Sequence, residues 1–153
     1  MDNKIIPYGS QWIEEDDIKS VIKTLKSDYL TTGPKIEEFE EKFAEYVNAE
    51  YAVAVANGTT ALHAANYAAE ISKGDEVITT PITFAASANS VLYQGGTPVF
   101  ADIDDKTYNI DPQAIEKNIT DKTKAIIPVH YTGQPCKMDE IKKIANKYDL
   151  TII

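Results

Sequence analysis

After residue 50 the chain alternates short apolar runs with helix-like segments, and this alternation limits the possible fold more than any other feature. The apolar runs carry hydrophobic residues on both faces of a strand, as in YAVAVA and KAIIPVH. Strands covered on both faces and separated by helices predict an α/β fold, with a mostly parallel sheet in a three-layer αβα arrangement. The expected strands are residues 51–56, 75–80, 97–103, 124–130 and 150–153, and the expected helices are residues 59–71, 84–94, 111–119 and 138–148.

Two amphipathic helices are expected before this region. Residues 14–27 repeat Ile, Val and Leu at helical spacing. A second helix is expected to begin at Pro34, because proline suits the first turn of a helix. We therefore expect residues 1–34 to form an N-terminal arm with the first helix. Residues 35–153 are expected to form the N-terminal part of a larger domain.

The composition excludes several classes of protein. The chain has 153 residues and a net charge of −9, and it contains no arginine, which argues against nucleic acid or anionic membranes as partners. The single Cys136 rules out an intrachain disulfide and favours a reducing compartment. The first residues do not resemble a signal peptide, and no apolar run is long enough to span a membrane. These features predict a cytoplasmic protein.

The last apolar run stops at Ile153, inside an expected strand. Ligands of open α/β sheets bind at the carboxyl ends of the strands. We therefore expect the chain to be the N-terminal part of a longer protein, with some of its site residues lying further on.

An Asn-Gly-Thr-Thr sequence stands between the first expected strand and the helix that follows it. Asn57 is typical of a helix N-cap, and Gly58 lets a ligand approach the backbone. The hydroxyls of Thr59 and Thr60, with the free N–H groups of the helix start, can bind a phosphate. The same residues also suit an ordinary strand-to-helix turn. The glycine patterns of dinucleotide and nucleoside-triphosphate sites are absent here, which argues against a Rossmann nucleotide-binding domain.

Two further stretches follow strands at the same expected edge of the sheet. Phe84 lies near a helix start, where its ring can stack on a flat heteroaromatic cofactor or fill core space. His130, Tyr131 and Gln134 follow another strand. Cys136 has no histidine or cysteine at ligand spacing, so no metal site is predicted there. A Cys–His nucleophile pair is possible in principle, but nothing in the sequence shows that Cys136 is activated, and a structural cysteine is the favoured interpretation.

Four stretches together resemble the DegT/DnrJ/EryC1/StrS family of nucleotide-sugar aminotransferases. They are LTTGPKIEEFEEKFAEYV, VAVANGTTALHAA, GDEVITTPITFAASANSVLYQGGTPVFADID and TKAIIPVHYTGQP. The resemblance runs in order over nearly the whole chain. It implies a pyridoxal-phosphate enzyme with the aspartate aminotransferase type I fold, of which this chain would hold an incomplete large domain.

The resemblance also implies roles for individual residues. The implied phosphate loop is Gly58, Thr59 and Thr60, the implied ring-stacking residue is Phe84, and the implied substrate residues are Tyr8, Thr31, Thr32 and Gly33. The family's Schiff-base lysine, and the aspartate that pairs with the pyridine nitrogen, are expected beyond Ile153. No catalytic residue is therefore assigned within the chain, and the chain alone is expected to be inactive.

The implied reaction is transamination of a nucleotide-linked 4-keto-6-deoxy sugar by a homodimer, with glutamate as the amino donor, in the synthesis of bacterial surface polysaccharide. The motifs YLTTGP, ITFAASAN and HYTGQPC are most similar to the branch that aminates C4 of UDP-linked N-acetylhexosamines, which includes the transaminase of the pseudaminic-acid pathway. Two alternatives stay open: a sugar dehydratase of the same fold, in which histidine replaces the lysine, and a non-catalytic binding or regulatory fragment.

Overall fold

The computed structural model describes residues 9–153, which fall into two compact units, one ending at Ala54 and the other spanning Val55–Ile153. The first unit contains two helices, α1 (Glu15–Leu25) and α2 (Pro34–Val47). The predicted boundary between residues 34 and 35 concerns the domains of a complete protein, and it stays a prediction.

Both helices of the first unit begin where the sequence indicates. The backbone N–H of Glu14 donates to Asp17 at 2.8 Å at the start of α1, where acidic residues also favour the helix dipole. Pro34 occupies the first turn of α2, and Asn48 ends this helix in the left-handed conformation with φ of 55°. Asparagine tolerates that conformation better than most residues, so it terminates the helix cleanly.

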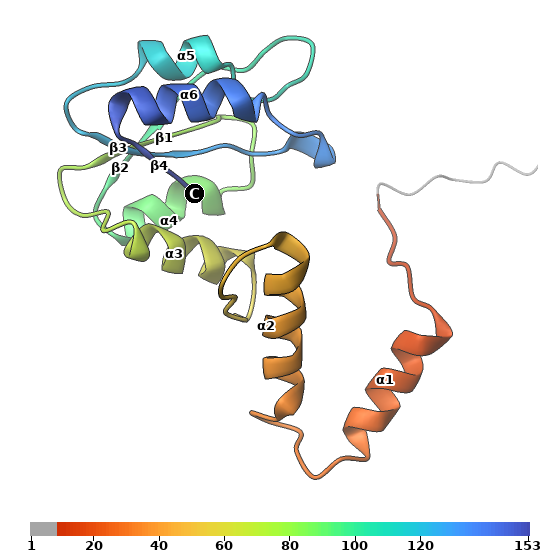
Figure 1. Ribbon diagram of the computed structural model, residues 1–153. Helices are drawn as coiled ribbons and strands as arrows, with labels where there is room; N and C mark the ends of the chain where they lie inside the picture. The colour runs from red at the N-terminus through yellow and green to blue at the C-terminus, as the bar shows by residue number, and fades with distance from the viewer. Residues whose placement is uncertain (1–8) are drawn as a thin grey trace, which may run out of the picture. The chain divides into compact units, whose positions relative to one another are not determined.

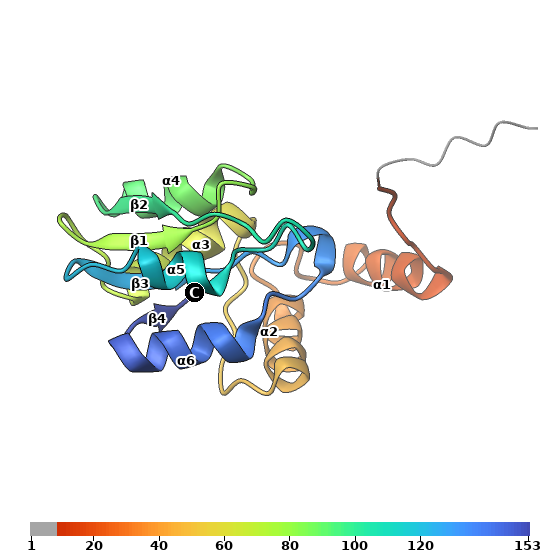
Figure 2. The ribbon, with the colours of Figure 1, turned by 90° about the horizontal axis from the view of Figure 1, so that it is seen from above.

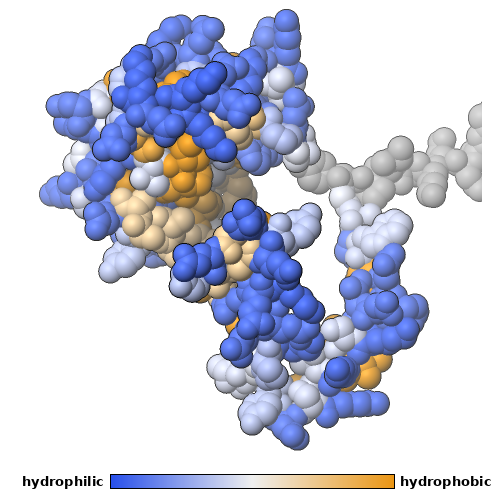
Figure 3. All heavy atoms as spheres, in the orientation of Figure 1, coloured by the Kyte–Doolittle hydropathy of each residue, from blue (hydrophilic) through white to orange (hydrophobic). Residues whose placement is uncertain are grey.

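The apolar stripes of these two helices are exposed in the described part of the chain. No residue of α1 is buried, and Ala44 is the buried residue of α2. Hydrophobic residues are visible at the surface among the hydrophilic ones over α1 (Figure 3). The exposed stripe residues are Ile18, Val21, Ile22 and Leu25 on α1, and Ile36, Phe39, Phe43 and Val47 on α2.

A four-stranded parallel sheet forms the centre of the second unit (Figures 1 and 2). Helices α3 and α4 cover one face of the sheet, and α5 and α6 cover the other. In spatial order the strands are β2 (Thr97–Phe100), β1 (Glu76–Thr79), β3 (Thr123–Ile127) and β4 (Thr151–Ile152). The helices are α3 (Gly58–Ala68), α4 (Ala86–Tyr93), α5 (Pro112–Lys117) and α6 (Met138–Tyr148), with a short 3-10 turn η1 (Tyr131–Gly133). The predicted α/β three-layer arrangement is therefore confirmed.

Successive residues of the central strands point to opposite faces and build two separate cores. Val77 packs with Val91 in the core on the side of α3 and α4. Its neighbour Ile78 packs with Ile115 and Ile141 in the core on the side of α5 and α6. All five side chains are fully buried, and burying each contributes about 1.5–3 kcal/mol. This two-sided burial explains why the strands read as continuous apolar runs.

The prediction of a strand at residues 51–56 is wrong. This segment has no strand conformation, and the side chains of Tyr51 and Val53 are 78% and 80% exposed. A strand needs a neighbour to accept its backbone hydrogen bonds, and none of the described strands pairs with this segment. The apolar composition of the segment was therefore not sufficient to make a strand.

Two other strands end earlier than expected. β3 ends at Ile127, where Pro128 lacks the N–H group needed to continue the ladder. β2 ends at Phe100, and beyond it Ile103 makes only an isolated antiparallel bridge with Ile110. Both shortenings leave loops at the carboxyl edge of the sheet.

Candidate cofactor-binding site

The carboxyl edge of the sheet gathers three of the loops singled out in the sequence. Thr79 and Ile127 are partners in the register between β1 and β3, so these strands end side by side. The buried hydroxyl of Thr79 donates to the Ile127 carbonyl at 3.0 Å and ties the two ends together. Helices α3 and α4 begin at this same edge, where η1 also lies (Figures 1 and 2).

Asn57 caps the first turn of α3. Its side-chain Oδ1 accepts hydrogen bonds from the backbone N–H of Thr60 at 2.9 Å and from the Thr60 hydroxyl at 3.0 Å. The Asn57 carbonyl accepts the N–H of Ala61 at 3.1 Å. The first N–H groups of a helix have no partner within the helix. Among the described residues, the N–H groups of Gly58 and Thr59 are therefore left for a ligand.

Gly58 leaves the start of α3 open. A Cβ built on this residue would meet no atom of residues 9–153 within 4 Å, so the packing of these residues does not require a glycine here. Its backbone can approach an anion directly, next to the positive end of the helix dipole. The capped turn, the two remaining N–H groups and the open space fit the phosphate of a cofactor such as pyridoxal phosphate.

Phe84 is a surface residue and not part of the core. Its side chain is 78% exposed, two residues before α4 begins. The Phe84 carbonyl accepts the N–H of Ser87 at 3.1 Å, and the hydroxyls of Thr83 and Ser87 lie 2.8 Å apart. The backbone beside Phe84 is thus held by the first turn of α4, while its ring remains available to stack on a flat ligand.

A buried hydrogen bond joins the two helices that carry these residues. The amide nitrogen of Asn66 on α3 donates to the hydroxyl of Ser90 on α4 at 3.0 Å, and it also donates to the Leu62 carbonyl at 2.9 Å. Asn66 and Ser90 are both fully buried. Buried polar groups are costly unless they are paired, so this bond favours the packing in which the amide of Asn66 meets Ser90.

The predicted substrate residues lie in the first unit or outside the described part of the chain. Thr31 is in the bend before α2, Thr32 has a left-handed φ of 49°, and Gly33 is the N-cap of α2. Thr32 and Gly33 line an open hollow of about 550 Å³ together with Tyr29 and residues of α2. Tyr8 lies outside the described residues.

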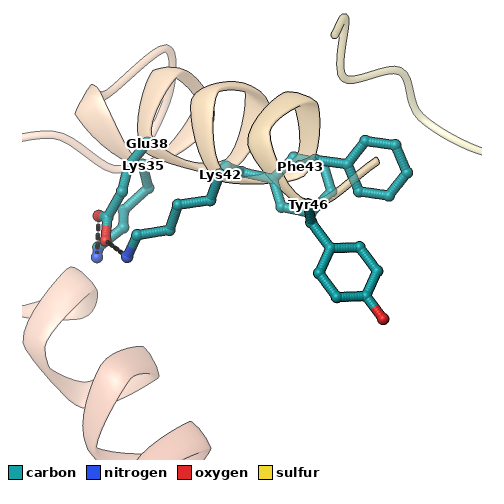
Figure 4. A pocket seen from close by; sticks show the side chains of 6 residues that line it. Lys35, Glu38, Lys42, Phe43 and Tyr46 are labelled. Atoms are coloured by element: carbon teal, nitrogen blue, oxygen red, sulfur yellow. Dashed lines mark hydrogen bonds and ion pairs between the residues drawn. The ribbon is translucent and has the colours of Figure 1, made fainter. Parts of the chain in front are cut away.

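A second hollow, of about 450 Å³, lies along α2 and contains none of the predicted cofactor residues. Figure 4 shows Lys35 and Lys42 reaching Glu38, and the rings of Phe43 and Tyr46 further along α2. Hydrogen bonds from both lysines lower the pKa of Glu38 to about 2. These are exposed groups that keep their charges in water, so this hollow is a surface feature of a helix.

Cys136 is a buried residue with a hydrogen-bonded thiol. Its Sγ donates to the Val129 carbonyl at 3.1 Å, and burial raises the pKa of the thiol. A thiol that stays protonated is a poor nucleophile. Among residues 9–153, no three His, Cys, Asp or Glu side chains form a group that could hold a metal ion. No helix in this same part of the chain is long and apolar enough to cross a membrane.

The sequence reasoning missed two buried asparagines of this unit. Asn66 joins α3 to α4, and Asn109 joins two loops at the carboxyl edge. Their side chains are 0% and 4% exposed. A buried asparagine in an otherwise apolar or small-residue context is the signal that could have pointed to them, but its partners cannot be read from sequence spacing.

The family profile of the DegT/DnrJ/EryC1/StrS aminotransferases matches residues 11–153. The chain belongs to this family. Protein MJ1066 of Methanocaldococcus jannaschii is 53% identical over 148 residues, which cover 97% of this chain and 38% of the relative. The spore coat polysaccharide biosynthesis protein SpsC of Bacillus subtilis is 46% identical over 151 residues, which cover 99% of this chain and 39% of SpsC. The chain thus spans less than two fifths of the length of these relatives.

Solved aminotransferases share this fold. Helicobacter pylori PseC, an aminotransferase involved in the biosynthesis of pseudaminic acid, superposes with a TM-score of 0.87 at 36% identity over 95% of this chain and 40% of PseC. NtdA of Bacillus subtilis, with its bound cofactor PMP, superposes with a TM-score of 0.85 at 38% identity over 92% of this chain and 33% of NtdA. These likenesses confirm the predicted fold of the pyridoxal-phosphate aminotransferases, of which the chain covers a part.

Proposed function

We propose that this chain supplies the phosphate loop and the ring-stacking residue of a pyridoxal-phosphate-dependent sugar aminotransferase. The observation that carries the proposal is the open, capped start of α3 at the same sheet edge as the exposed ring of Phe84. Membership of the aminotransferase family supports it, as does the bound PMP of NtdA, which is the amine form of the same cofactor.

The chain's own residues bind and orient the cofactor. The N–H groups of Gly58 and Thr59 donate to the phosphate, and the Thr60 hydroxyl turns from Asn57 to add a third hydrogen bond. Phe84 stacks on the pyridine ring and fixes its plane. When bound, pyridoxal phosphate supplies the electron sink that nitrogen transfer requires. The Schiff-base lysine and the aspartate for the ring nitrogen are proposed to lie outside these 153 residues, so that the chain alone is inactive.

The proposed substrate is a UDP-linked 4-keto-6-deoxy-N-acetyl sugar, aminated at C4 with glutamate as the donor. PseC, which acts in pseudaminic acid biosynthesis, supports a product of the 4-amino-4,6-dideoxy-altrosamine type. SpsC, a spore coat polysaccharide biosynthesis protein, supports the wider class of surface-sugar enzymes. Tyr8, Thr31, Thr32 and Gly33 are proposed to approach this substrate.

The complete enzyme is proposed to be a cytoplasmic homodimer, with an N-terminal arm over residues 1–34 and the large domain starting at residue 35. The exposed apolar stripes of α1 and α2 support association, because soluble monomers rarely expose large contiguous apolar patches. The surface over α3 and α4 is also weakly hydrophobic (Figure 3).

Gly58→Ala in the complete aminotransferase tests the proposal. A methyl group at this position meets no atom of the described residues within 4 Å and φ is not left-handed, so the fold of this part should be unaffected. The methyl group should instead obstruct the phosphate and reduce retention of pyridoxal phosphate in equilibrium dialysis. The matched control is Gly9→Ala, where the added Cβ is equally free. Equal cofactor retention by the two variants would remove the start of α3 from the phosphate site.

A further inference from the structure

We propose that His130 is a further substrate-binding residue, that its Nε2–H donates to a substrate oxygen, and that Asn109 is its positioning residue. This inference rests on the proposed function, because it assigns a role within that same site. Neither residue is among those already predicted to bind the cofactor phosphate, to stack on the cofactor ring or to bind the substrate.

The position of His130 places it at the candidate site. It follows β3 by three residues, and β3 lies beside β1, whose carboxyl end leads to Phe84. The 3-10 turn η1 that follows His130 lies on the side of the sheet where α3 and α4 begin (Figures 1 and 2). The side chain of His130 is exposed, and ligands of open α/β sheets bind at this edge.

The orientation of the His130 ring is fixed by the chain itself. The backbone N–H of Cys136 donates to Nδ1 of His130 at 3.2 Å. A neutral imidazole that accepts at Nδ1 carries its proton on Nε2. The other ring nitrogen is therefore a hydrogen-bond donor, and the His130 side chain is exposed. Its partner must be an acceptor, such as a hydroxyl or phosphate oxygen of a sugar nucleotide or a carboxylate oxygen of an amino donor.

The loop after His130 contains little regular secondary structure that could keep the His130 ring in place. Thr132 and Gly133 have left-handed φ values of 52° and 88°, and η1 is a single 3-10 turn. Single turns of this kind are held by few internal hydrogen bonds. Here these bonds are Gly133 N–H to the His130 carbonyl and Gln134 N–H to the Tyr131 carbonyl, both at 3.0 Å.

Asn109 supplies the missing support from a loop more than twenty residues away in sequence. Its Nδ2 donates to the carbonyls of Gln134 at 3.1 Å and Pro135 at 3.2 Å, and its Oδ1 accepts the N–H of Tyr131 at 2.9 Å. The side chain is 4% exposed, so these bonds are shielded from water. One buried amide thus holds both ends of the segment that follows His130.

The loop that carries Asn109 is itself held by hydrogen bonds to Asp104. Oδ1 of Asp104 accepts the N–H groups of Lys106 and Thr107, both at 3.0 Å. Oδ2 of Asp104 lies 3.2 Å from Nζ of Lys137, just beyond the segment that Asn109 holds. The two loops are therefore joined at two points, and a disturbance at Asn109 should reach His130 and not the phosphate loop on α3.

The test uses two substitutions of His130 in the complete aminotransferase. His130→Gln keeps an N–H donor near the position of Nε2 and removes the acceptor at Nδ1, whereas His130→Asn keeps an acceptor near Nδ1 and removes the distal donor. We expect His130→Asn to lower kcat/KM about 3- to 10-fold more than His130→Gln, the range of one neutral hydrogen bond. The substrate whose KM rises more in His130→Asn, the keto sugar or the amino donor, identifies the acceptor.

Asn109→Asp tests whether Asn109 positions His130. The substitution replaces the amide donor by a carboxylate oxygen, which is then directed at the carbonyls of Gln134 and Pro135. The control is Asn118→Asp at the end of α5. The Asn118 amide also donates to a backbone carbonyl, that of Ala114 at 2.8 Å, but Asn118 lies before β3 and away from the carboxyl edge. We expect Asn109→Asp to raise the same KM as His130→Asn with unchanged cofactor absorbance. We expect the control to change neither.

The possible results distinguish a failure of the proposed function from a failure of the roles given to His130 and Asn109. If the wild-type enzyme neither retains pyridoxal phosphate nor transfers an amino group to a keto sugar, the proposed function fails. If the wild-type enzyme is active but His130→Gln and His130→Asn are equally impaired, His130 does not donate from Nε2. If Asn109→Asp changes only the unfolding temperature, as a purely structural residue would, Asn109 does not position the substrate contact.

Discussion

Oδ1 of Asn57 accepts two hydrogen bonds from Thr60, one from its backbone N–H at 2.9 Å and one from its hydroxyl at 3.0 Å. The cap therefore orders the first turn of α3 before any ligand binds, and it leaves the two preceding N–H groups pointing out of the helix. An anion that binds there meets a preorganised site, which lowers the entropy cost of binding.

Thr60→Val should weaken the retention of pyridoxal phosphate by the complete enzyme. A lost hydrogen bond to a charged group costs about 1.5–3 kcal/mol, which is about 10- to 150-fold in affinity. Equilibrium dialysis followed by the cofactor's absorbance measures this. Thr60→Ser, which keeps the hydroxyl, is the control and should bind nearly as well as wild type. An unchanged affinity in Thr60→Val would remove the hydroxyl from the phosphate site.

Phe84→Ala should separate a cofactor role from a structural one. The side chain is 78% exposed, so the free energy of unfolding of the cofactor-free protein should change by less than about 0.5 kcal/mol. If the ring stacks on the pyridine, cofactor affinity should fall by about 0.5–1.5 kcal/mol and the visible absorption band should shift. Phe84→Tyr should restore both properties. A large loss of stability without a spectral change would contradict the stacking role.

Gly96→Ala should destabilise the protein without any ligand. A Cβ at this position would lie 2.8 Å from Cγ2 of Ile71 and 3.0 Å from Cγ1 of Val91, inside the core on the side of α3 and α4. Overpacking of this kind costs about 1–3 kcal/mol. Urea unfolding measures the loss, with Gly9→Ala as a control whose Cβ meets no atom of the described residues. Equal midpoints for the two variants would show that the core yields to the added methyl group.

Asp104 should make the stability of its loop depend on acid pH. Hydrogen bonds from the backbone of Lys106 and Thr107, and then from Lys137, lower the pKa of Asp104 from its usual 3.8 to about 2. A lowered pKa in the folded state means that the charged carboxylate stabilises the protein above about pH 3.8, and that this contribution disappears as the pH falls towards 2.

Asp104→Asn should therefore lower the stability measured by urea unfolding at pH 7, and the difference from wild type should shrink as the pH falls from 4 to 2. Asp105→Asn removes a charge from the same loop and serves as the control. A difference between wild type and Asp104→Asn that stays constant over this range would mean that the ionised carboxylate does not hold the loop.

Much of the fold follows from short-range patterns. The helices α2 and α6 begin at the residues that the sequence indicates, because a proline in the first turn and a run of helical periodicity act over a few residues. The phosphate loop on α3 is also local, since Asn57 caps a turn only three residues away. Its use by a cofactor is still a prediction.

Local sequence patterns predict the order and type of most elements, most of the helix starts and the loop at Asn57. The tertiary structure decided the strand order β2-β1-β3-β4, the failure of residues 51–56 to form a strand, and the exposure of Phe84. It also decided the contacts of Asn66 and Asn109 with residues 24 to 26 positions away. The reason is physical: helix periodicity and caps act within one or two turns, whereas a strand or a buried amide is stable only when a distant segment supplies its hydrogen-bond partners.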